Sequence, residues 1–469
     1  MPIFLRRTHA PLRPLIAAAM MAALAACGGK SAAPGGAPAP RTQGIANRPT
    51  SAGPEYDASR LYTQMGFLAA GPAVPFVGAI SYRASASIDS TDVTIGLSLA
   101  NAALSFARDN DRFVAGYSVT LTIRQGGLIA RDISTHEVVR VSSYKETSRL
   151  DESVVFQQGL LLPPGQYALA ATIKDDGSGR SSSQEMTFTV PRLGAPGTLS
   201  TPVPYLQAVV RRSKAAVADL VVNPRATVSF GRDSVIGLYV EGYGEGDRLP
   251  LSLEVRNDAG RLLYRDTLSL PHRTDLFSGV AYIPVPRIGI GVSVVSIWPT
   301  GGADTTRAPV FVTFGEGLPV AKFEDMMQYL RWFASQYRVN QLRNAEPEAR
   351  AEAWTNFVKA TDSSPLTPVN EDLIEYFDRL MNVSSRFREE GTPGWMTDRG
   401  KVFLGIGQPD QIYDQGLAGM GTRGRTQVWE YRRLNIQLVF YDQSGFDRWR
   451  LTNSSEMEFQ AAWQRRVNR

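Results

Sequence analysis

The residues best suited to chemistry gather in one segment of the C-terminal third of the chain. The segment carries an aromatic ring, a hydroxyl, a guanidinium, two carboxylates and turn-forming residues, namely Trp395, Thr397, Asp398, Arg399, Gly400, Pro409 and Asp410. A carboxylate accepts protons or hydrogen bonds, and a guanidinium binds carboxylates in a fixed planar geometry. Asp398 and a second acid could therefore do acid–base work. The acids available as its partner are Asp410, Glu430 and Asp442.

Other kinds of catalysis lack their usual residues in this part of the chain. Only His136 and His272 follow the first 27 residues, and Cys27 is the single cysteine among 469 residues. A Ser-His-Asp or Cys-His arrangement, or a His-rich zinc site, therefore has no histidine to use in the C-terminal third. We predict a protein that is not an enzyme, with no metal site and no cofactor. Both histidines are interpreted as surface or packed residues.

Two interpretations of the segment stay open. Gly394 and Gly400 permit backbone conformations that other residues avoid, and Thr397 can bond the amides of a turn. The segment would then be a rigid connection from a helix to a strand. Alternatively, four of its side chains line one groove that recognises a partner, because Trp and Arg often anchor interfaces. These four are Trp395, Asp398, Arg399 and Asp410.

A glycine-rich stretch nearby imitates a nucleotide-binding motif. Residues Gly419-Met420-Gly421-Thr422-Arg423-Gly424 fit the spacing G-x-G-x-x-G. That motif requires a strand leading into it and a helix opening after it, and neither is indicated here. We interpret residues 416–425 as a flexible glycine loop.

The segment belongs to a wider sequence pattern. Thr367-Pro368-Val369-Asn370-Glu371 precedes it, and Val428-Trp429-Glu430-Tyr431 follows it. Over about residues 322–451, the pattern around Gly394-Trp395-Met396-Thr397-Asp398 resembles the bacterial GWxTD-domain family, although Gln408 stands where a second proline is common. The resemblance implies a secreted or lipid-anchored protein, often with β-domains ahead of the motif domain, and no biochemical activity defines the family. It adds Trp429 to the candidate binding residues.

The first residues of the chain predict an export signal. Arg6, Arg7 and Arg13 form a positive region, Leu15 to Ala26 form an apolar region, and Leu24-Ala25-Ala26-Cys27 places small residues before a cleavage point. The apolar region is shorter than the roughly 20 residues that a spanning helix needs. Its ending resembles the bacterial lipobox. That resemblance implies a diacylglyceryl group on the Cys27 sulfur and acylation of the new amino terminus.

These features predict a protein anchored outside the cytoplasm. We expect a signal peptide over residues 1–26, a lipid on Cys27, and a Gly/Pro/Ala-rich tether over residues 27–55. Several acyl chains would anchor the protein firmly in a membrane. Gly28, rather than Asp, follows the cysteine, which resembles outer-membrane cargo in bacterial lipoprotein sorting. We therefore expect a bacterial cell-envelope protein in the outer membrane, facing the periplasm or the cell surface.

The charge of the chain does not call for a polyanionic partner. The sequence has 50 Lys and Arg against 45 Asp and Glu, and three of the arginines fall in residues 1–26. Because no aromatic–basic stripe is present, we predict no nucleic-acid binding. The expected partners are the membrane, through Cys27, and an unknown envelope protein bound or scaffolded by the C-terminal domain. The alternative is a hydrolase that acts on an envelope polymer with the acids near Asp398.

The rest of the chain predicts a multidomain, mainly β fold with an α+β C-terminal domain. Short alternating runs between turn residues indicate two immunoglobulin-like antiparallel β-sandwiches, over residues 56–193 and 194–317. Leu162-Pro163-Pro164-Gly165-Gln166-Tyr167 matches a turn that sets a tyrosine corner, with an ordinary turn and core tyrosine as the alternative. The hairpin over residues 119–132 resembles that over 251–266, through duplication or through chance similarity of amphipathic strands. The sandwiches show no aromatic platform for carbohydrate.

Residues 318–469 predict a helical segment followed by a small antiparallel sheet. A helical stripe runs from 323 to 337, a second helix opens at Pro347, and a third runs from Thr367-Pro368 to Gly391. Four short runs predict strands, at residues 401–406, 426–432, 436–442 and 448–452. Ser455 to Glu458 has the pattern of a capping box for a last helix.

Overall fold

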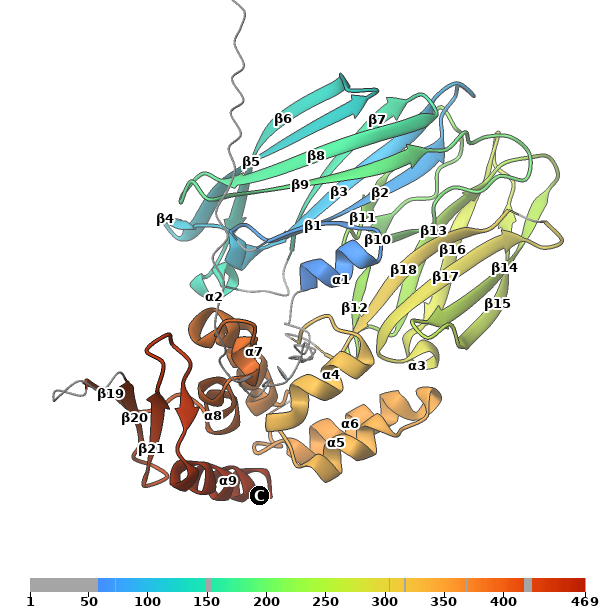
Figure 1. The fold of residues 1–469 in the computed structure, drawn as a ribbon. Helices are drawn as coiled ribbons and strands as arrows, with labels where there is room; N and C mark the ends of the chain where they lie inside the picture. Colours follow the sequence, from blue (N-terminus) through green and yellow to red (C-terminus); the bar gives the residue numbers. More distant parts are fainter. Residues whose placement is uncertain are drawn as a thin grey trace, which may run out of the picture. The chain divides into compact units, whose positions relative to one another are not determined.

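The computed structural model describes residues 58–71, 73–148, 153–302, 304–315, 318–367, 369–416 and 424–468. These residues belong to one compact unit in which antiparallel sheets dominate and helices gather toward the C-terminus (Figure 1). The predicted signal peptide, Cys27, the tether and most of the glycine loop lie outside the described residues. Within the described ranges, no helix is long and apolar enough to cross a membrane.

The first module consists of a short helix and two antiparallel sheets. Helix α1 spans Ala58–Gln64. One sheet has the order β1-β2-β3-β7, with β1 at Leu68–Ala70, β2 at Phe76–Ala84, β3 at Thr91–Ala100 and β7 at Ser153–Leu162. The other has the order β4-β5-β8-β9, with β6 paired to β5. Its strands are β4 at Ala107–Asp109, β5 at Arg112–Gln125, β6 at Leu128–Val141, β8 at Gly165–Asp175 and β9 at Ser181–Val190. Two short helices lie in the connections, η1 at Asn101–Ala103 and α2 at Tyr144–Thr147.

Alternation of buried and exposed side chains explains how these sheets face each other. Every second side chain of β5 from Ala115 to Ile123 is buried, and so are Leu169 and Ile173 of its neighbour β8. A strand places successive side chains on opposite faces, so this pattern turns one face of the sheet toward the core. At the start of β8 the Tyr167 hydroxyl donates to the Pro163 carbonyl at 2.9 Å. The predicted tyrosine-corner hydrogen bond is therefore confirmed.

The second module also has two sheets. The first has the order β11-β10-β13-β16, with β10 at Val203–Ala208, β11 at Leu220–Val222, β13 at Val235–Gly242 and β16 at Phe277–Pro284. The second has the order β12-β18-β17-β14-β15, with β12 at Thr227–Ser229, β14 at Arg248–Asn257, β15 at Leu262–Pro271, β17 at Gly291–Pro299 and β18 at Thr306–Thr313. Helix α3, Val285–Ile288, connects β16 to β17. All of these pairings are antiparallel except that of β12 with β18.

The two hairpins with similar sequences share an irregularity. The β5–β6 register shifts between Ile123 and Arg124, and the β14–β15 register shifts between Val255 and Arg256. In both hairpins the first strand also pairs with a third, antiparallel strand, which is β8 for β5 and β17 for β14. Alternation alone does not fix the position of a bulge, which inserts one extra residue at a defined point. Bulges beside a hairpin turn are common, so duplication and chance similarity both stay open.

The chain turns helical after β18. The helices before the motif are α4 at Phe323–Tyr329, η2 at Leu330–Trp332, α5 at Gln336–Arg343, η3 at Pro347–Ala349, α6 at Arg350–Thr361 and α7 at Glu371–Phe387. The motif segment holds η4 at Gly394–Met396 and α8 at Asp398–Ile406. A sheet of order β19-β20-β21-β22 follows, with β19 at Gln411–Gly416, β20 at Arg425–Tyr431, β21 at Ile436–Asp442 and β22 at Arg450–Leu451. Helix α9, Asn453–Val467, ends the described chain.

The predicted strand over residues 401–406 is wrong. These residues form most of α8, whose first turn is capped by the Thr397 side chain. The apolar residues Val402, Phe403 and Leu404 are all buried, so the helix is covered on more than one side. A short apolar run of this kind does not distinguish a buried strand from a buried helix by periodicity alone.

Several predicted helix ends also need correction. The stripe from 323 to 337 is divided among α4, η2 and α5, and α7 begins at Glu371 with Asn370 as its cap rather than at Thr367. The last helix is capped by Thr452, whose hydroxyl accepts the Ser455 N–H at 3.4 Å. Ser455 has a different role, since its hydroxyl accepts the N–H of Val439 in β21.

The second module and the C-terminal helices share one hydrophobic core. Phe314, which follows β18, stacks on Phe323 of α4 with ring centroids 6.4 Å apart. It also meets Trp354 of α6 edge-on at 4.9 Å, and the Trp354 Nε1 donates to the Phe314 carbonyl at 2.6 Å. These buried contacts attach the helices directly to the β18 end of the sheet.

A buried polar cluster joins the first and second modules. Arg211, between β10 and β11, pairs with Glu241 of β13 through an Nη2–Oε2 contact of 2.7 Å, and both side chains are almost fully buried. The same Nη2 donates to the carbonyl of Ala84 in β2. The Tyr243 hydroxyl donates to Glu241 and accepts the Ala84 N–H at 2.7 Å. Both ionised side chains are shielded from water, so each one depends on the other for a compensating charge.

Candidate functional site

Two glycines of the motif segment are fixed by close backbone contacts. A Cβ on Gly394 would lie 2.3 Å from the Val383 carbonyl oxygen and 2.6 Å from the Cα of Ser384, both in α7. A Cβ on Gly400 would lie 1.8 Å from the Gly394 carbonyl oxygen. Backbone atoms cannot turn aside as the end of a flexible side chain can. Glycine is therefore required at both positions by close approach of the chain.

Thr397 joins these two glycines. Its hydroxyl accepts the Gly400 N–H at 3.0 Å and donates to the Gly394 carbonyl at 2.8 Å. The residue is 2% exposed. A threonine at this position satisfies one of the free amides at the start of a helix. Gly394, Thr397 and Gly400 thus form a single closed turn that starts α8.

Asp398 connects the start of α8 to the sheet and to α9. Its Oδ2 accepts the N–H of Leu451 in β22 at 2.8 Å, and its Oδ1 lies 3.2 Å from the Lys401 Nζ. Lys401 also forms an ion pair with Glu456 of α9. In the first turn of a helix a carboxylate is further stabilised by the helix dipole. Its oxygens are therefore committed to contacts within the protein.

Trp395, in the same turn, is buried in the core. It is 2% exposed and meets Tyr329 of α4 edge-on, with ring centroids 5.8 Å apart. The guanidinium of Arg331 lies 5.8 Å from its ring centroid. The Trp395 ring is thus an internal contact between η4 and the first C-terminal helix.

Arg399 points toward the sheet, between two aromatic rings. Its guanidinium carbon lies 5.0 Å from the ring centroid of Trp449 and 5.5 Å from that of Phe387. Burial lowers the pKa of Arg399, against the opposing charge of Glu389. The Nε atom is buried without a hydrogen-bond partner, and the side chain forms no hydrogen bond or ion pair with any residue that the structure describes. Arg399 is therefore held by its aromatic contacts and by the more distant charges of Glu389, Asp447 and Asp442.

Pro409 and Asp410 lie beyond the other end of α8. Pro409 is buried, whereas Asp410 is exposed. The Asp410 N–H donates to the Glu430 carbonyl at 2.9 Å, and its Oδ2 accepts the Arg432 N–H at 2.7 Å. These two bonds fasten the loop after α8 to the end of β20. They do not bring Asp410 to Asp398.

Trp429 belongs to the core of the small sheet. It is fully buried, its Nε1 donates to the Gln427 side chain at 2.8 Å, and its ring lies against Phe440 at 4.8 Å and Phe387 at 5.4 Å. Its contact with Phe387 connects it to the ring on which Arg399 stacks. Trp429 supports that position from inside and does not reach the surface.

Asp442 is the acid most tightly held by its neighbours. Burial alone would raise its pKa, but hydrogen bonds from the Arg425 and Ser444 side chains and from the Gly445 and Asp447 N–H groups outweigh burial and hold that pKa well below its usual range. The side chain is fully buried. The structure therefore places Asp398, Asp410 and Asp442 in separate backbone-bonded positions.

The C-terminal part of the sequence matches a known family model. The match covers residues 303–469 and is to the GWxTD domain, so it begins just before β18 and runs through α9. The chain therefore contains a GWxTD domain. The family name describes the sequence of the turn at Gly394 to Asp398 and assigns no activity to the domain.

The other comparisons give only weak similarities for the GWxTD-domain protein. No curated protein matches the sequence. Two solved structures show partial similarity: dimeric latent PorU from Porphyromonas gingivalis, at 12% identity over 50% of this chain with a TM-score of 0.23, and trypsin-activated alpha-2-macroglobulin from Escherichia coli, at 10% identity over 51% with a TM-score of 0.17. This chain covers only 20% and 16% of those two proteins.

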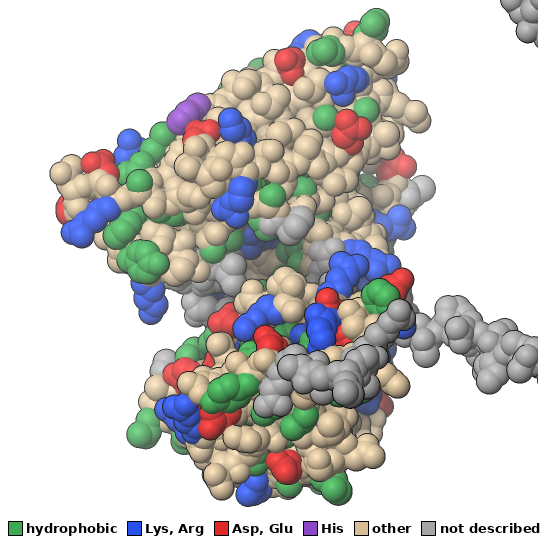
Figure 2. Space-filling model, turned by 60° about the vertical axis from the view of Figure 1, so that its left-hand side comes forward, with side chains coloured by type: hydrophobic (Ala, Val, Ile, Leu, Met, Phe, Trp, Pro, Cys, Tyr) green, Lys and Arg blue, Asp and Glu red, His purple; other side chains and the backbone are tan. Residues whose placement is uncertain are grey.

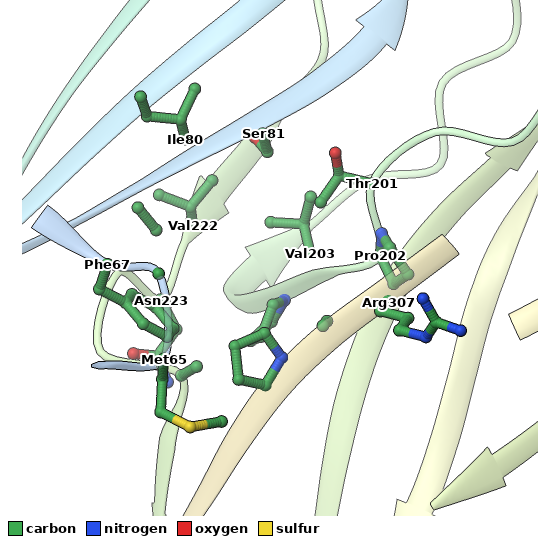
Figure 3. Close-up of a pocket in the computed structure, with 16 residues that line it drawn as sticks. Met65, Phe67, Ile80, Ser81, Thr201, Pro202, Val203, Val222, Asn223 and Arg307 are labelled. Carbon is green, nitrogen blue, oxygen red and sulfur yellow. The ribbon is translucent and has the colours of Figure 1, made fainter. Parts of the chain in front are cut away.

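A cavity between the two β-modules was not predicted from the sequence. It measures about 150 Å³, and apolar side chains form most of its wall (Figure 3). Its lining comes from the α1–β1 turn, β2, β10, β11 and β18, and includes Met65, Phe67, Ser81, Val203, Val222 and Arg307. The Ser81 hydroxyl is buried there without a hydrogen-bond partner. Because these residues are far apart in the sequence, no local pattern marks the cavity.

His136 lies at the surface and His272 is a packed residue, as the sequence predicted. His136 is 57% exposed beside Asp176, and His272 packs edge-on against Phe277 at 4.9 Å. Among the described residues, no three His, Cys, Asp or Glu side chains are grouped to hold a metal ion. Figure 2 shows hydrophobic side chains scattered over the face in view, interspersed with charged ones.

Proposed function

We propose that this GWxTD-domain protein is a lipid-anchored component of the bacterial cell envelope that binds or scaffolds a partner protein and catalyses no reaction. In this proposal the lipid on Cys27 holds the chain at the outer membrane. The tether over residues 27–55 and two immunoglobulin-like modules present the C-terminal domain to its partner. The lipobox-like sequence at Leu24-Ala25-Ala26-Cys27 supports the anchor.

The proposal that the protein catalyses no reaction rests on the hydrogen bonds of the acids in the motif region. Asp398, Asp410 and Asp442 each accept a backbone N–H, from Leu451, Arg432 and Asp447 respectively. A general acid or base has to exchange a proton with a substrate within hydrogen-bond reach. Carboxylates fixed to amides of their own fold are suited to hold α8 against the sheet. This use of the acids favours binding over hydrolysis.

The anchor can be tested by metabolic labelling of the full-length protein in a bacterial host. An alkyne-bearing fatty acid should label the wild type and place it in the membrane fraction. Cys27→Ser should lose the label and the membrane association. The matched control is Cys27→Ser/Ser31→Cys, which restores a thiol at the wrong position and should stay unlabelled. Labelling of either variant would contradict the anchor on Cys27.

The role of the protein can be tested by crosslinking in cells and mass spectrometry of the tagged protein. A binding or scaffolding role predicts recovery of the same envelope protein across cultures and crosslinkers. The hydrolase alternative predicts instead that purified protein releases soluble fragments from peptidoglycan or lipopolysaccharide, and that Asp398→Asn or Asp410→Asn abolishes the release. Fragment release with that dependence would contradict a non-catalytic role.

A further inference from the structure

Arg399 differs from the other residues of the motif in having no polar partner. The side chains of Thr397, Asp398 and Asp410 all bond to the backbone of their own fold. Arg399 instead lies against Trp449 and Phe387, with its Nε buried and the side chain as a whole half-buried. A guanidinium has five N–H donors, and burying donors without acceptors is costly. Its position therefore suits a ligand that supplies the missing acceptors.

The acids around Arg399 are already bound by other cations. Glu389 is almost fully buried, and its two oxygens accept from the Trp449 N–H at 3.0 Å and from Arg450 at 2.8 Å. Asp442 and Asp447 both pair with Arg425. The Arg425 guanidinium also lies 5.2 Å from the Trp449 ring. Among the residues that the structure describes, these contacts leave no oxygen acceptor bonded to the guanidinium of Arg399.

A second guanidinium contacts the ring of Phe387. Arg386, at the end of α7, is exposed and lies 5.5 Å from the ring centroid of Phe387 and 4.8 Å from that of Phe403. Like Arg399, it forms no hydrogen bond or ion pair with a residue that the structure describes. Phe387 therefore contacts two arginines, neither of which is bound to an acid that the structure describes. We call Arg386, Phe387, Arg399 and Trp449 the arginine–aromatic site.

We propose that the arginine–aromatic site binds a carboxylate on an acidic segment of a partner protein, with Arg399 as the central donor and Arg386 beside it. This inference rests on the binding role proposed above and names the chemistry of the partner. A guanidinium between aromatic rings presents a planar edge that matches a carboxylate. The charges of Glu389, Asp442 and Asp447 act on Arg399 and repel any anion there, and they repel a singly charged carboxylate less than a doubly charged phosphate. Trp and Arg are also residues that anchor interfaces.

The test uses full-length protein in detergent micelles and a fluorescein-labelled peptide of alternating Glu and Ser. Fluorescence anisotropy should show saturable binding that weakens with salt, and the peptide with Gln in place of Glu should not bind. Arg399→Gln should weaken binding by about tenfold, as expected for loss of one charge-assisted pair. Arg386→Gln should weaken it less. Arg465→Gln, which removes an exposed cation from α9, is the matched control and should leave binding unchanged.

Arg399→Lys tests whether weaker binding by Arg399→Gln comes from misfolding or from the lost guanidinium. Lysine keeps the positive charge beside the rings but not the planar fork, so its thermal melting should stay near that of the wild type while binding weakens severalfold. Equal binding of both peptides by the wild type, or unchanged binding in Arg399→Gln, would overturn the proposal. Stronger competition by inorganic phosphate than by acetate would also overturn it, in favour of a phosphate ligand. Partner capture in cells that persists in Arg399→Gln would leave the binding role standing and remove only this site.

Discussion

The carbonyl oxygen of Gly394 occupies the place where a side chain on Gly400 would begin, 1.8 Å from an ideal Cβ. The two glycines of the motif therefore form one contact, closed by the Thr397 hydroxyl that bonds to both residues. This turn sets the direction of α8, and α8 in turn places Asp398 against β22 and Arg399 against Trp449. The motif is thus a joint that positions its charged residues.

Gly400→Ala should destabilise the protein strongly. A methyl group at that position would overlap the Gly394 backbone, and overpacking of this kind costs about 3 kcal/mol or more when backbone must move. Urea unfolding followed by tryptophan fluorescence measures the change. Gly159→Ala is the control, because a Cβ on Gly159 in β7 meets nothing within 4 Å. A Gly400→Ala protein as stable as Gly159→Ala would show that the Gly394 carbonyl does not press on the Cβ position of Gly400.

Thr397→Val tests how much the hydrogen bonds of the Thr397 hydroxyl, rather than the volume of its side chain, contribute to stability. Valine fills a similar volume but leaves the Gly400 N–H and the Gly394 carbonyl without their bonds, at a cost of about 1–2 kcal/mol for a lost helix cap. Thr397→Ser keeps the hydroxyl and should stay within about 1 kcal/mol of the wild type. Both are compared by urea midpoint. Equal loss in the two variants would mean that the methyl group, and not the hydrogen bonds, carries the effect.

The sequence predicted the β-rich fold better than it predicted the motif. Alternation over residues 119–124 and 251–256 marks strands because it reports directly which side chains are buried. The helix over residues 398–406 was missed for two reasons. Val402, Phe403 and Leu404 are buried on several sides and show no helical stripe, and the residue three positions after Thr397 is glycine rather than the Glu or Gln of a capping box.

The candidate site depended on contacts that a sequence does not display. One of the two open interpretations placed Arg399 in a groove with Trp395, yet its guanidinium lies against the rings of Phe387 and Trp449. In the sequence, η4 separates Arg399 from Phe387, and three strands separate it from Trp449. Nothing local distinguishes an arginine that pairs with Glu from one that stacks on Trp. The residue types of the motif could be read from the sequence, whereas their partners required the fold.

The cluster that joins the two β-modules should behave as a coupled unit. Arg211→Met alone would leave Glu241 buried without its cation, which costs about 3–5 kcal/mol. Arg211→Met/Glu241→Leu removes both charges and should lose clearly less than the sum of the two single variants. A double-mutant cycle on urea unfolding gives the coupling energy. Additive effects would show that the pair contributes no interaction of its own.

Ser81→Ala tests the polar atom in the cavity between the modules. The Ser81 hydroxyl is buried without a partner, so removing it should leave stability unchanged or raise it by up to about 1 kcal/mol. Ser278→Ala is the contrast, because the Ser278 hydroxyl donates to the Arg211 carbonyl at 2.6 Å and its loss should destabilise the protein. Differential scanning calorimetry compares the two. Marked destabilisation by Ser81→Ala would mean that the hydroxyl bonds to a water or ligand in the cavity.

Asp442 should give the small sheet a specific sensitivity to acid. Its hydrogen bonds hold its folded-state pKa below the unfolded value of about 3.9. The unfolded chain therefore takes up the proton first as the pH falls, so the stabilisation is complete above about pH 5 and is lost as the pH drops through 3.9 toward the folded pKa. Asp442→Asn should cost about 2–3 kcal/mol at pH 7, because a neutral amide replaces the buried charge that pairs with Arg425 and leaves that guanidinium with Asp447 alone. The difference from wild type should shrink between pH 5 and pH 2, measured as the urea midpoint at each pH. Asp304→Asn, at an exposed position, should follow the wild type throughout, and a constant difference for Asp442→Asn would show that Asp442 does not titrate in this way.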